Sequence, residues 1–206
     1  MAPLRSRSTG AARLAIGVVG LAASAVPVRR DSIGRREHRA FRLVNDLPDW
    51  LHRPAWMVMQ LGALGAAPAA ASVAYLLGER PLAARLGVSG LSAWVLAKAV
   101  KQVVRRGRPA TVVTDVRHRG PESRGLGYLS GHAAVSMALI LVAVPHLGRR
   151  TRWLALTAAP VVGLSRIYVG AHLPLDVVGG ASLGLLVEGA TRRLEMAPIV
   201  IASHRY

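Results

Sequence analysis

The sequence contains 206 residues, which suits a single domain and gives no reason to expect two. Hydrophobic residues make up 52% of it, with many Ala, Val and Leu but a single Phe, and this mixture suits helices packed in lipid better than a soluble core. The net charge of +17 comes almost entirely from arginine and is compatible with anionic lipid, an anionic substrate or nucleic acid as partner. The absence of cysteine excludes disulfides, thiolate metal sites and cysteine nucleophiles.

The first apolar segment covers residues 14–28 and follows a basic, polar stretch at 1–13. This arrangement is typical of a signal peptide or of a first membrane span, although the run is shorter than the roughly 20 residues that a span needs. We favour a retained span, because other apolar segments follow and Val26-Pro27-Val28 is a poor small-residue cleavage site.

Residues 29–53 are charged and contain scattered apolar side chains such as Phe41 and Leu47. We expect an amphipathic helix that lies in the membrane interface, with Trp50 and Trp56 at the level of the lipid headgroups. A solvated linker between two spans is the alternative.

Five further apolar segments follow, separated by short polar connections. They cover residues 54–77, 82–104, 130–147, 153–169 and 174–190. Because lipid cannot satisfy exposed backbone groups, we expect an all-α fold, an integral membrane bundle of six transmembrane helices with an interfacial helix near the N-terminus. Residues 1–206 would form one membrane domain, made of an N-terminal span and interfacial segment (1–53), a helical core (54–193) and a tail (194–206).

The connections between these segments carry their own expectations. Residues 78–81 form a turn, residues 105–128 a polar loop and residues 149–152 a basic turn, and Arg192-Arg193 ends the last span. Ser130 suits the N-cap of the helix that follows it. The small residues that resemble a helix-contact face, with a cleft for a lipid tail as the alternative, are Gly62, Gly65, Ala66, Ala67 and Ala69.

Ionisable residues at the ends of membrane spans are costly and are therefore candidates for function. They gather in three groups, at residues 101–109, 130–132 and 165–176. Because each span crosses the membrane, the ends of the third and fifth spans share one face with the starts of the fourth and sixth. The topology therefore predicts that the three groups meet.

The cationic and amide groups of these clusters suit a phosphate. Lys101, Arg108 and Arg166 supply cationic donors, and the two arginines can bind oxygens in a bidentate fork. Ser130 and the amide of Gly131 lie at a predicted helix N-terminus, which is a natural anion site.

A histidine and a carboxylate complete the predicted chemistry. Pro174 suits the first turn of the last helix, which puts His172 just before that helix and Asp176 inside its first turn. Asp176 can orient one ring nitrogen of His172 and stabilise its positive form, so that the other nitrogen attacks phosphorus. His132 could protonate the leaving oxygen. Such a site transfers a phosphoryl group without a metal or another cofactor.

The pattern Lys-x6-Arg-Pro, Ser-Gly-His and Ser-Arg-x5-His-x3-Asp resembles the signature of the type-2 phosphatidic acid phosphatase family. The residues that match in type, spacing and order are Lys101, Arg108, Pro109, Ser130, Gly131, His132, Ser165, Arg166, His172 and Asp176. The resemblance covers the second half of the chain, and the six-span layout extends it to the rest. Leu129 departs from the Pro that the family usually carries before Ser-Gly-His.

The resemblance implies a metal-independent hydrolase of phosphoric esters that needs no cofactor. It implies that His172 becomes phosphorylated, that Asp176 supports it, and that His132 donates a proton to the departing alcohol before water hydrolyses the phosphohistidine. The residues that would hold the phosphoryl oxygens are Lys101, Arg108, Ser130, Gly131 and Arg166.

Each residue has a simpler explanation when it is taken alone, and only the joint spacing of the motifs favours a catalytic site. A lone His at a helix end is more often a surface or capping residue, and Lys101 could snorkel to the interface. Asp115, His118 and Glu122 could shape a headgroup pocket, although we favour a solvated loop. The histidines that match no motif, and that we take as incidental, are His38, His52, His146 and His204.

Three functions remain open at this point. The leading hypothesis is a membrane phosphatase that hydrolyses a lipid phosphomonoester or pyrophosphate, such as phosphatidic acid, phosphatidylglycerophosphate, a polyprenyl (pyro)phosphate or a polyprenyl-linked sugar phosphate. A lipid phosphotransferase and a non-catalytic protein that binds anionic lipid are the alternatives. We expect no nucleic-acid partner, since no aromatic-basic platform is visible. With a cytoplasmic N-terminus the site would face outward from a bacterial plasma membrane, although the positive-inside rule does not decide the orientation.

Overall fold

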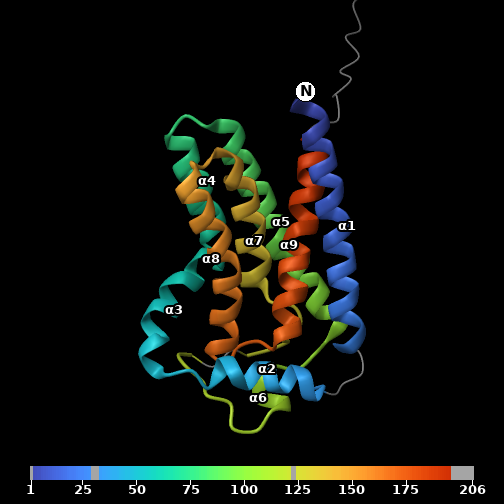
Figure 1. Cartoon of the computed structure of the whole chain (residues 1–206), viewed down its shortest axis with the longest axis vertical. Helices are drawn as coiled ribbons and strands as arrows, with labels where there is room; N and C mark the ends of the chain where they lie inside the picture. Colours follow the sequence, from blue (N-terminus) through green and yellow to red (C-terminus); the bar gives the residue numbers. More distant parts are fainter. Residues whose placement is uncertain (1, 29–32, 122–123, 196–206) are drawn as a thin grey trace, which may run out of the picture.

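The computed structural model describes residues 2–28, 33–121 and 124–195, and within these ranges the chain is helical and has no strand. Figure 1 shows an elongated bundle of helices that run along its long axis. These are α1 (Ala2–Val28), α4 (Ala66–Leu76), α5 (Arg80–Val104), α7 (Gly131–Ala143) with the 3-10 turn η3 (Val144–His146), α8 (Arg149–Tyr168) and α9 (Pro174–Glu195). The predicted all-α fold is confirmed.

Short helices close the end of the bundle where α8 passes into α9 (Figure 1). There α2 (Arg35–Asn45) lies across the bundle, with α6 (Pro109–Val112) beside it. The elements that lead from α2 to α4 are η1 (Asp49–Leu51), α3 (His52–Met59) and η2 (Gln60–Gly62), and α3 packs against α8.

Two buried side chains anchor α2 to this end. Phe41 is fully buried and packs with Ile167 and Leu173. The Asn45 amide donates to the carbonyl of Ile167 at 3.4 Å and to that of Arg117 at 2.9 Å, and its oxygen accepts the N–H of Arg117 at 2.9 Å. A buried amide with partners on both atoms fixes the orientation of the helix that carries it. The helix expected within residues 29–53 therefore exists; its place at a membrane interface stays a prediction, and residues 29–32 lie outside the described ranges.

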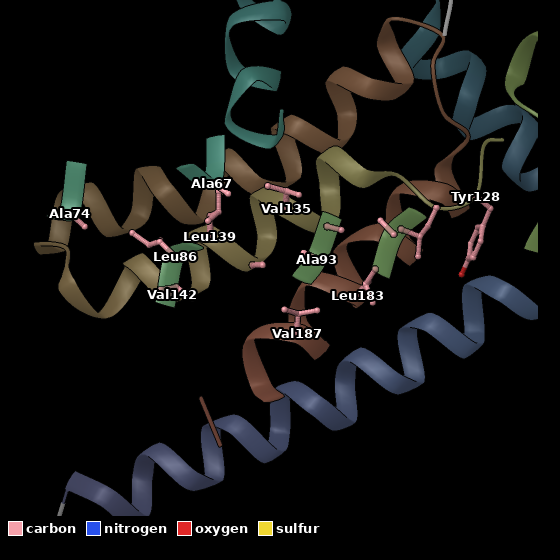
Figure 2. Packing of buried hydrophobic residues seen from close by; sticks show 14 of the residues in the cluster. Ala67, Ala74, Leu86, Ala93, Tyr128, Val135, Leu139, Val142, Leu183 and Val187 are labelled. Carbon is pink, nitrogen blue, oxygen red and sulfur yellow. The ribbon is translucent and has the colours of Figure 1, made fainter. Parts of the chain in front are cut away.

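Helix α7 forms the centre of the core because it is apolar on all sides. Val135 and Val142 of α7 belong to one cluster of buried side chains with Leu86 of α5 (Figure 2). A Cβ on Gly184 of α9 would lie 2.5 Å from the carbonyl oxygen of Ala134, so α7 and α9 approach each other backbone to backbone.

Helix α1 packs along α9 through small residues (Figure 1). A Cβ on Gly17 would lie 2.8 Å from the carbonyl oxygen of Ser182, and one on Gly20 would lie 2.3 Å from the Ser182 hydroxyl. A Cβ on Gly189 would lie 2.9 Å from the carbonyl oxygen of Gly10. Such small residues allow the close backbone approach on which helix packing in lipid depends.

The segment predicted as a span at residues 54–77 is not one straight helix, and whether it crosses the membrane stays a prediction. The chain bends by 69° between Asp49–Gly62 and Ala66–Leu76. Gly62 lies at the bend, and a Cβ there would come within 2.3 Å of the carbonyl oxygen of His132. The bend thus lays the backbone of η2 on the first turn of α7, which a straight helix could not do.

The predicted contact face is confirmed at some of its residues. Besides Gly62, Ala67 meets α5 closely, since a Cβ on Gly90 would lie 2.4 Å from the Cβ of Ala67. Gly65 has no atom of the described residues within 4 Å of the position where its Cβ would be, so it makes no such contact.

Several helix boundaries differ from the prediction, because charged residues extend the helices. The basic start is helical from Ala2, and Ser8–Val28 provides a 21-residue stretch of span-like hydropathy. Helix α8 already begins at Arg149, and α9 runs on through Arg192 and Arg193 to Glu195, so arginines expected in connections occupy terminal helical turns. The loop at residues 105–128 contains α6.

Within the described ranges, only Ser8–Val28 has the length and apolar composition of an unbroken membrane span, and the bent pair qualifies as a broken second one. Helices α5, α8 and α9 have 25, 20 and 22 residues and carry arginine or lysine at their ends. The count of six spans and the single-domain division at residues 53 and 193 therefore stay predictions. Most of the expected tail, residues 196–206, lies outside the described ranges.

Candidate active site

The cationic residues of the candidate site come from three parts of the chain that meet at the end covered by α2 (Figure 1). Lys101 lies in the last turn of α5 and Arg166 in the last turn of α8. Arg108 immediately precedes α6, and its Nη1 donates to the carbonyl of Ala171 at 2.8 Å. Arg108 therefore joins the loop after α5 to the loop that holds His172.

Ser130 is the N-cap of α7, as predicted, and its Oγ accepts the N–H of Ala133 at 3.4 Å. The N–H of Ser130 donates to the carbonyl of Asp176 at 2.8 Å, which ties the start of α7 to the first turn of α9. Gly131 and His132 form the first turn of α7, where backbone N–H groups and the helix dipole stabilise an anion.

His172 lies in the short connection before α9, and Asp176 lies in the first turn of that helix. Both side chains are buried. Nδ1 of His172 is 3.4 Å from Oδ2 of Asp176, and the same oxygen accepts the N–H of Leu173 at 2.9 Å. Because Nδ1 faces the carboxylate, Nε2 on the other side of the ring points away from it. The carboxylate thus orients the imidazole for reaction at Nε2.

Arg106 and Glu37 extend this contact, and sequence reasoning missed both. Arg106 Nη1 donates to Asp176 Oδ1 at 3.0 Å, and the guanidinium binds both carboxylate oxygens of Glu37, at 3.0 and 2.6 Å. Glu37 also accepts the N–H of Leu175 in the first turn of α9 at 3.0 Å. A buried chain from Glu37 through Arg106 therefore holds the second oxygen of Asp176.

The sequence contained only weak signals for these two residues. Arg106 occupies one of the variable positions of the first motif. Glu37 is the only acidic residue between Asp31 and Asp46, in a segment rich in arginine, and a lone carboxylate among arginines indicates an ion pair. Its partner is 69 positions away, so only the fold reveals the pair.

Lys101 and a glycine shape the loop beside the carboxylate. Nζ of Lys101 donates to the carbonyls of Leu126 and Gly127 at 3.1 and 2.9 Å. The N–H of Gly127 donates to the carbonyl of Arg106 at 2.7 Å. A Cβ on Gly127 would lie 3.3 Å from Oδ2 of Asp176, so the loop backbone passes close to the carboxylate.

His132 lies close enough to the other site residues for their charges to act on it. Its electrostatic neighbours include Arg166, His172, Arg108 and Lys101. Its backbone carbonyl is packed against Gly62, so the bend before α4 helps to place it. The structure thus gathers the residues of all three predicted groups at one end of the bundle.

The loop residues of the site differ in how burial affects their protonation. Burial lowers the pKa of His172 to about 4, although Asp176 opposes the shift, and the imidazole is therefore neutral at neutral pH. Burial alone would also lower the pKa of Arg106, but its hydrogen bonds with Glu37 and Asp176 prevail and raise it. The site thus combines a neutral imidazole with a guanidinium that stays charged.

The arrangement can support nucleophilic attack by an imidazole on a bound phosphate. Nε2 of His172 is the available nucleophile, Asp176 can stabilise the charge that develops on the ring, and the cations can hold phosphate oxygens. Nowhere in the described ranges do three or more His, Asp or Glu side chains gather in a way that could hold a metal ion.

A sequence model described as the PAP2 superfamily matches residues 82–197. The match includes all the predicted site residues. It leaves out α1 to α4, and with them Glu37.

Two curated relatives show the range of similar proteins. The undecaprenyl-diphosphatase of Sulfolobus acidocaldarius is 32% identical over 119 residues, which cover 56% of each chain. The decaprenylphosphoryl-5-phosphoribose phosphatase of Mycobacterium tuberculosis is 34% identical over 102 residues, which cover 49% of this chain and 54% of the relative. The chain thus matches about half the length of these relatives.

A solved structure shows the same fold over more of the chain. The crystal structure of a transmembrane PAP2-type phosphatidylglycerolphosphate phosphatase from Bacillus subtilis superposes with a TM-score of 0.65 at 22% identity. The superposition covers 86% of this chain and 94% of the other. The likeness of fold therefore extends beyond residues 82–197.

Proposed function

The chain belongs to the PAP2 superfamily, and on this premise we propose that it is an integral membrane lipid phosphatase that acts through a phosphohistidine. The observation that carries the proposal is the buried contact of His172 with Asp176, 3.4 Å apart, among cations from three parts of the chain. The substrate would be a phosphomonoester or pyrophosphate of a lipid, because the similar proteins are named for prenyl diphosphates, a prenyl-linked phosphoribose and phosphatidylglycerol phosphate.

In the first step, Nε2 of His172 attacks phosphorus. A P–N bond forms, and the bond between phosphorus and the leaving oxygen breaks. A protonated His132 gives its proton to that oxygen, and the lipid departs as an alcohol or, from a pyrophosphate, as a monophosphate. Asp176 stabilises the positive charge on the imidazole, while Lys101, Arg108 and Arg166 would hold the phosphoryl oxygens.

In the second step, water attacks the phosphohistidine and His132 accepts the proton of that water. The P–N bond breaks, inorganic phosphate leaves, and His172 returns to its neutral form. Arg106 and Glu37 keep Asp176 in place throughout, so the carboxylate does not have to reorganise when the charge on the imidazole changes.

Phosphate release from a panel of lipid phosphates tests the proposal. We expect the purified protein to release inorganic phosphate from at least one of phosphatidic acid, phosphatidylglycerophosphate and a polyprenyl diphosphate, in the presence of EDTA. His172→Ala should abolish release, whereas His146→Ala, an exposed histidine at the other end of the bundle, should not. Loss of activity in EDTA would contradict the metal-free mechanism, and transfer to an alcohol without phosphate release would identify a phosphotransferase.

The sidedness belongs to the same proposal, with the site facing outward from a bacterial plasma membrane. Because the chain has no cysteine, a single one can be introduced as a label site. Thr114→Cys in the exposed loop at the site end should react with an impermeant maleimide in intact cells, and Glu79→Cys at the opposite end should react after lysis. The reverse pattern would place the site in the cytoplasm.

A further inference from the structure

A cavity of about 360 Å³ adjoins the candidate site on the side of α3. Its walls come from α3, from the loop after α6 and from the last turn of α8 with the residues that follow. The lining residues that matter here are His52, Trp56, Met59, His118, Arg119 and Arg166. Arg166 lines this cavity and is also one of the cations of the candidate site, so a group bound in the cavity would lie next to the phosphate.

Polar atoms without partners point to a ligand in this cavity. Nε2 of His52 and Nε of Arg166 are buried and have no hydrogen-bond partner among the described residues. A Cβ on Gly120 would lie 3.9 Å from Nε2 of His52, so this nitrogen faces the loop that walls the cavity. Because a buried polar atom without a partner costs free energy, a ligand that bonds to it is favoured.

The second histidine of the cavity, His118, lies against the loop that leads into the nucleophile His172. A Cβ on Gly170, two positions before His172, would lie 3.4 Å from Nδ1 of His118 and 2.8 Å from the carbonyl oxygen of Arg117. Gly170 has φ +75°, and the missing side chain lets the loop lie against the end of α8. His118 is exposed and so stands at the mouth of the cavity.

Arg119 also lines the cavity, but its guanidinium is already engaged. Nε donates to Asp49 at 2.8 Å, Nη2 donates to the carbonyl of Leu47 at 2.7 Å, and the group lies 4.1 Å above the ring of Tyr168. Arg119 therefore builds the wall. It does not supply the additional positive charge that a second phosphate would require.

Two contacts connect the cavity wall to the residues that would act on the phosphate and its leaving group. Met59 of its wall is one helical turn before Gly62, and Gly62 packs on the backbone of His132, the proposed acid for the leaving oxygen. Nη1 of Arg166 donates to the sulfur of Met59 at 3.4 Å, which joins this wall to the phosphate cations. The part of the lipid that carries the scissile phosphate would therefore enter the cavity.

The chemistry of the lining selects the ligand. Two imidazoles offer both donors and acceptors, which match hydroxyl groups, and the half-exposed indole of Trp56 offers a flat face to a ring. The volume lies at the lower end of small-molecule sites, roughly 300–1,000 Å³. A lipid tail would leave the buried nitrogens of His52 and Arg166 without hydrogen-bond partners, whereas hydroxyl groups can pair with them. We propose that this cavity binds a hydroxyl-rich headgroup, a sugar or glycerol unit, to which the scissile phosphate is attached. The inference rests on the proposed phosphatase function and narrows its substrate class.

A comparison of two substrates tests this inference directly. We define the specificity ratio as kcat/KM for a polyprenylphosphoryl-ribose 5-phosphate divided by kcat/KM for phosphatidic acid, which has no polyol headgroup. We expect His52→Leu and His118→Leu each to lower the ratio about tenfold, as loss of a hydrogen bond to a ligand does, and His146→Leu to leave it unchanged. His118→Ala, which also removes the donor and the acceptor, replaces His118→Leu if the latter does not fold, and His118→Asn, which keeps both, should retain more of the ratio. A ratio within twofold of the wild-type value in both cavity variants would overturn the inference.

A binding measurement separates failure of this inference from failure of the proposed function. In His172→Ala protein, which cannot turn over, we expect ribose 5-phosphate to raise the unfolding midpoint more than inorganic phosphate at the same concentration does. Adding His52→Leu should remove the difference. If this pattern holds while no lipid phosphate is hydrolysed by the wild type, the headgroup site stands and the phosphatase proposal falls. If the wild type hydrolyses a lipid phosphate but ribose 5-phosphate and inorganic phosphate raise the unfolding midpoint equally, the phosphatase proposal stands and the headgroup site falls.

Discussion

The two ends of α9 each contain a fully buried carboxylate surrounded by arginine. Asp176, in the first turn, contacts Arg106 at 3.0 Å and His172 at 3.4 Å. Glu188, three turns further along, pairs with Arg13 at 2.5 Å, with Arg192 at 2.8 Å and with Arg85 at 3.7 Å. The helix is the same, and the carboxylates are equally inaccessible.

The balance of charge distinguishes the two sites. At the start of α9, one guanidinium serves two carboxylates, those of Asp176 and Glu37, and the surplus negative charge faces an imidazole. At the other end, guanidiniums from α1, α5 and α9 surround one carboxylate, and no histidine lies among its ion-pair partners in the described ranges. The first arrangement suits stabilisation of a developing positive charge, and the second joins three helices. Burial of a carboxylate alone therefore does not indicate catalysis; the partner that can change its charge does.

The largest expected effect is on catalysis at the first site. Asp176→Asn should lower kcat about a thousandfold, because an amide orients the His172 ring without stabilising its positive form. Steady-state phosphate release measures the effect, and circular dichroism with a thermal scan checks that the fold is kept. Glu79→Gln, an exposed carboxylate at the other end of the bundle, is the matched control and should retain wild-type kcat. Equal losses of kcat in Asp176→Asn and Glu79→Gln would show that the effect is not specific to the carboxylate beside His172.

Glu188→Gln should have the opposite profile, a loss of stability with kcat preserved. It leaves Arg13, Arg85 and Arg192 around a neutral amide, and removal of one member of a buried ionic cluster costs about 3–5 kcal/mol. Unfolding in detergent measures this cost, and kcat is compared at a temperature where both proteins are folded. A large drop in kcat of the folded variant would mean that the second site also serves catalysis.

A smaller loss of kcat is expected when Glu37 is substituted. This residue of α2 contacts Asp176 through Arg106. Glu37→Gln keeps an oxygen for the N–H of Leu175 but removes one of the two carboxylates on Arg106, which then draws more of the charge of Asp176. We expect kcat to fall about tenfold with KM within twofold, since only stabilisation of the charged imidazole is weakened. A rise in KM at constant kcat would instead assign Glu37 to substrate binding.

These residues also mark how far the sequence could predict the site. His172, Asp176 and Ser130 follow from local rules, because a Pro-started helix and an N-cap fix their positions within a few residues. Arg106, Glu37 and Glu188 were missed since their partners are distant in sequence and an ion pair has no periodic signature. The headgroup cavity was predicted only in part: His118 is weighed as part of a headgroup pocket although a solvated loop is favoured, and His52 is treated as incidental. The two histidines come from different segments, and only the fold brings them to one cavity.

The bend after Gly62 shows a different kind of failure. Hydropathy runs evenly through residues 54–77, so the pattern predicts one span. The chain bends where Gly62 packs on the carbonyl of His132, and Gly62 and Gly65 are weak helix formers that permit the break. The all-α class was predictable from composition and hydropathy, whereas the path of α3 to α4, which forms one wall of the cavity, was not.

The smallest expected effect is a shift in the pKa of His172, which should depend on Asp176 and not on Glu188. Burial lowers the pKa of His172 to about 4, and Asp176 opposes the shift. Because this value lies below that of an unfolded histidine, about 6.5, the folded protein loses stability as pH falls from about 6.5 to about 4.

In protein labelled with 15N-histidine and assigned with His172→Ala, the His172 ring should stay neutral at pH 6 and titrate near pH 4. Asp176→Asn should lower the midpoint further, whereas Glu188→Gln, at the far end of α9, should leave it unchanged. Titration near 6.5 in the wild type would show that the ring is not desolvated, and the nucleophile would then lose its neutral form in mildly acidic solution.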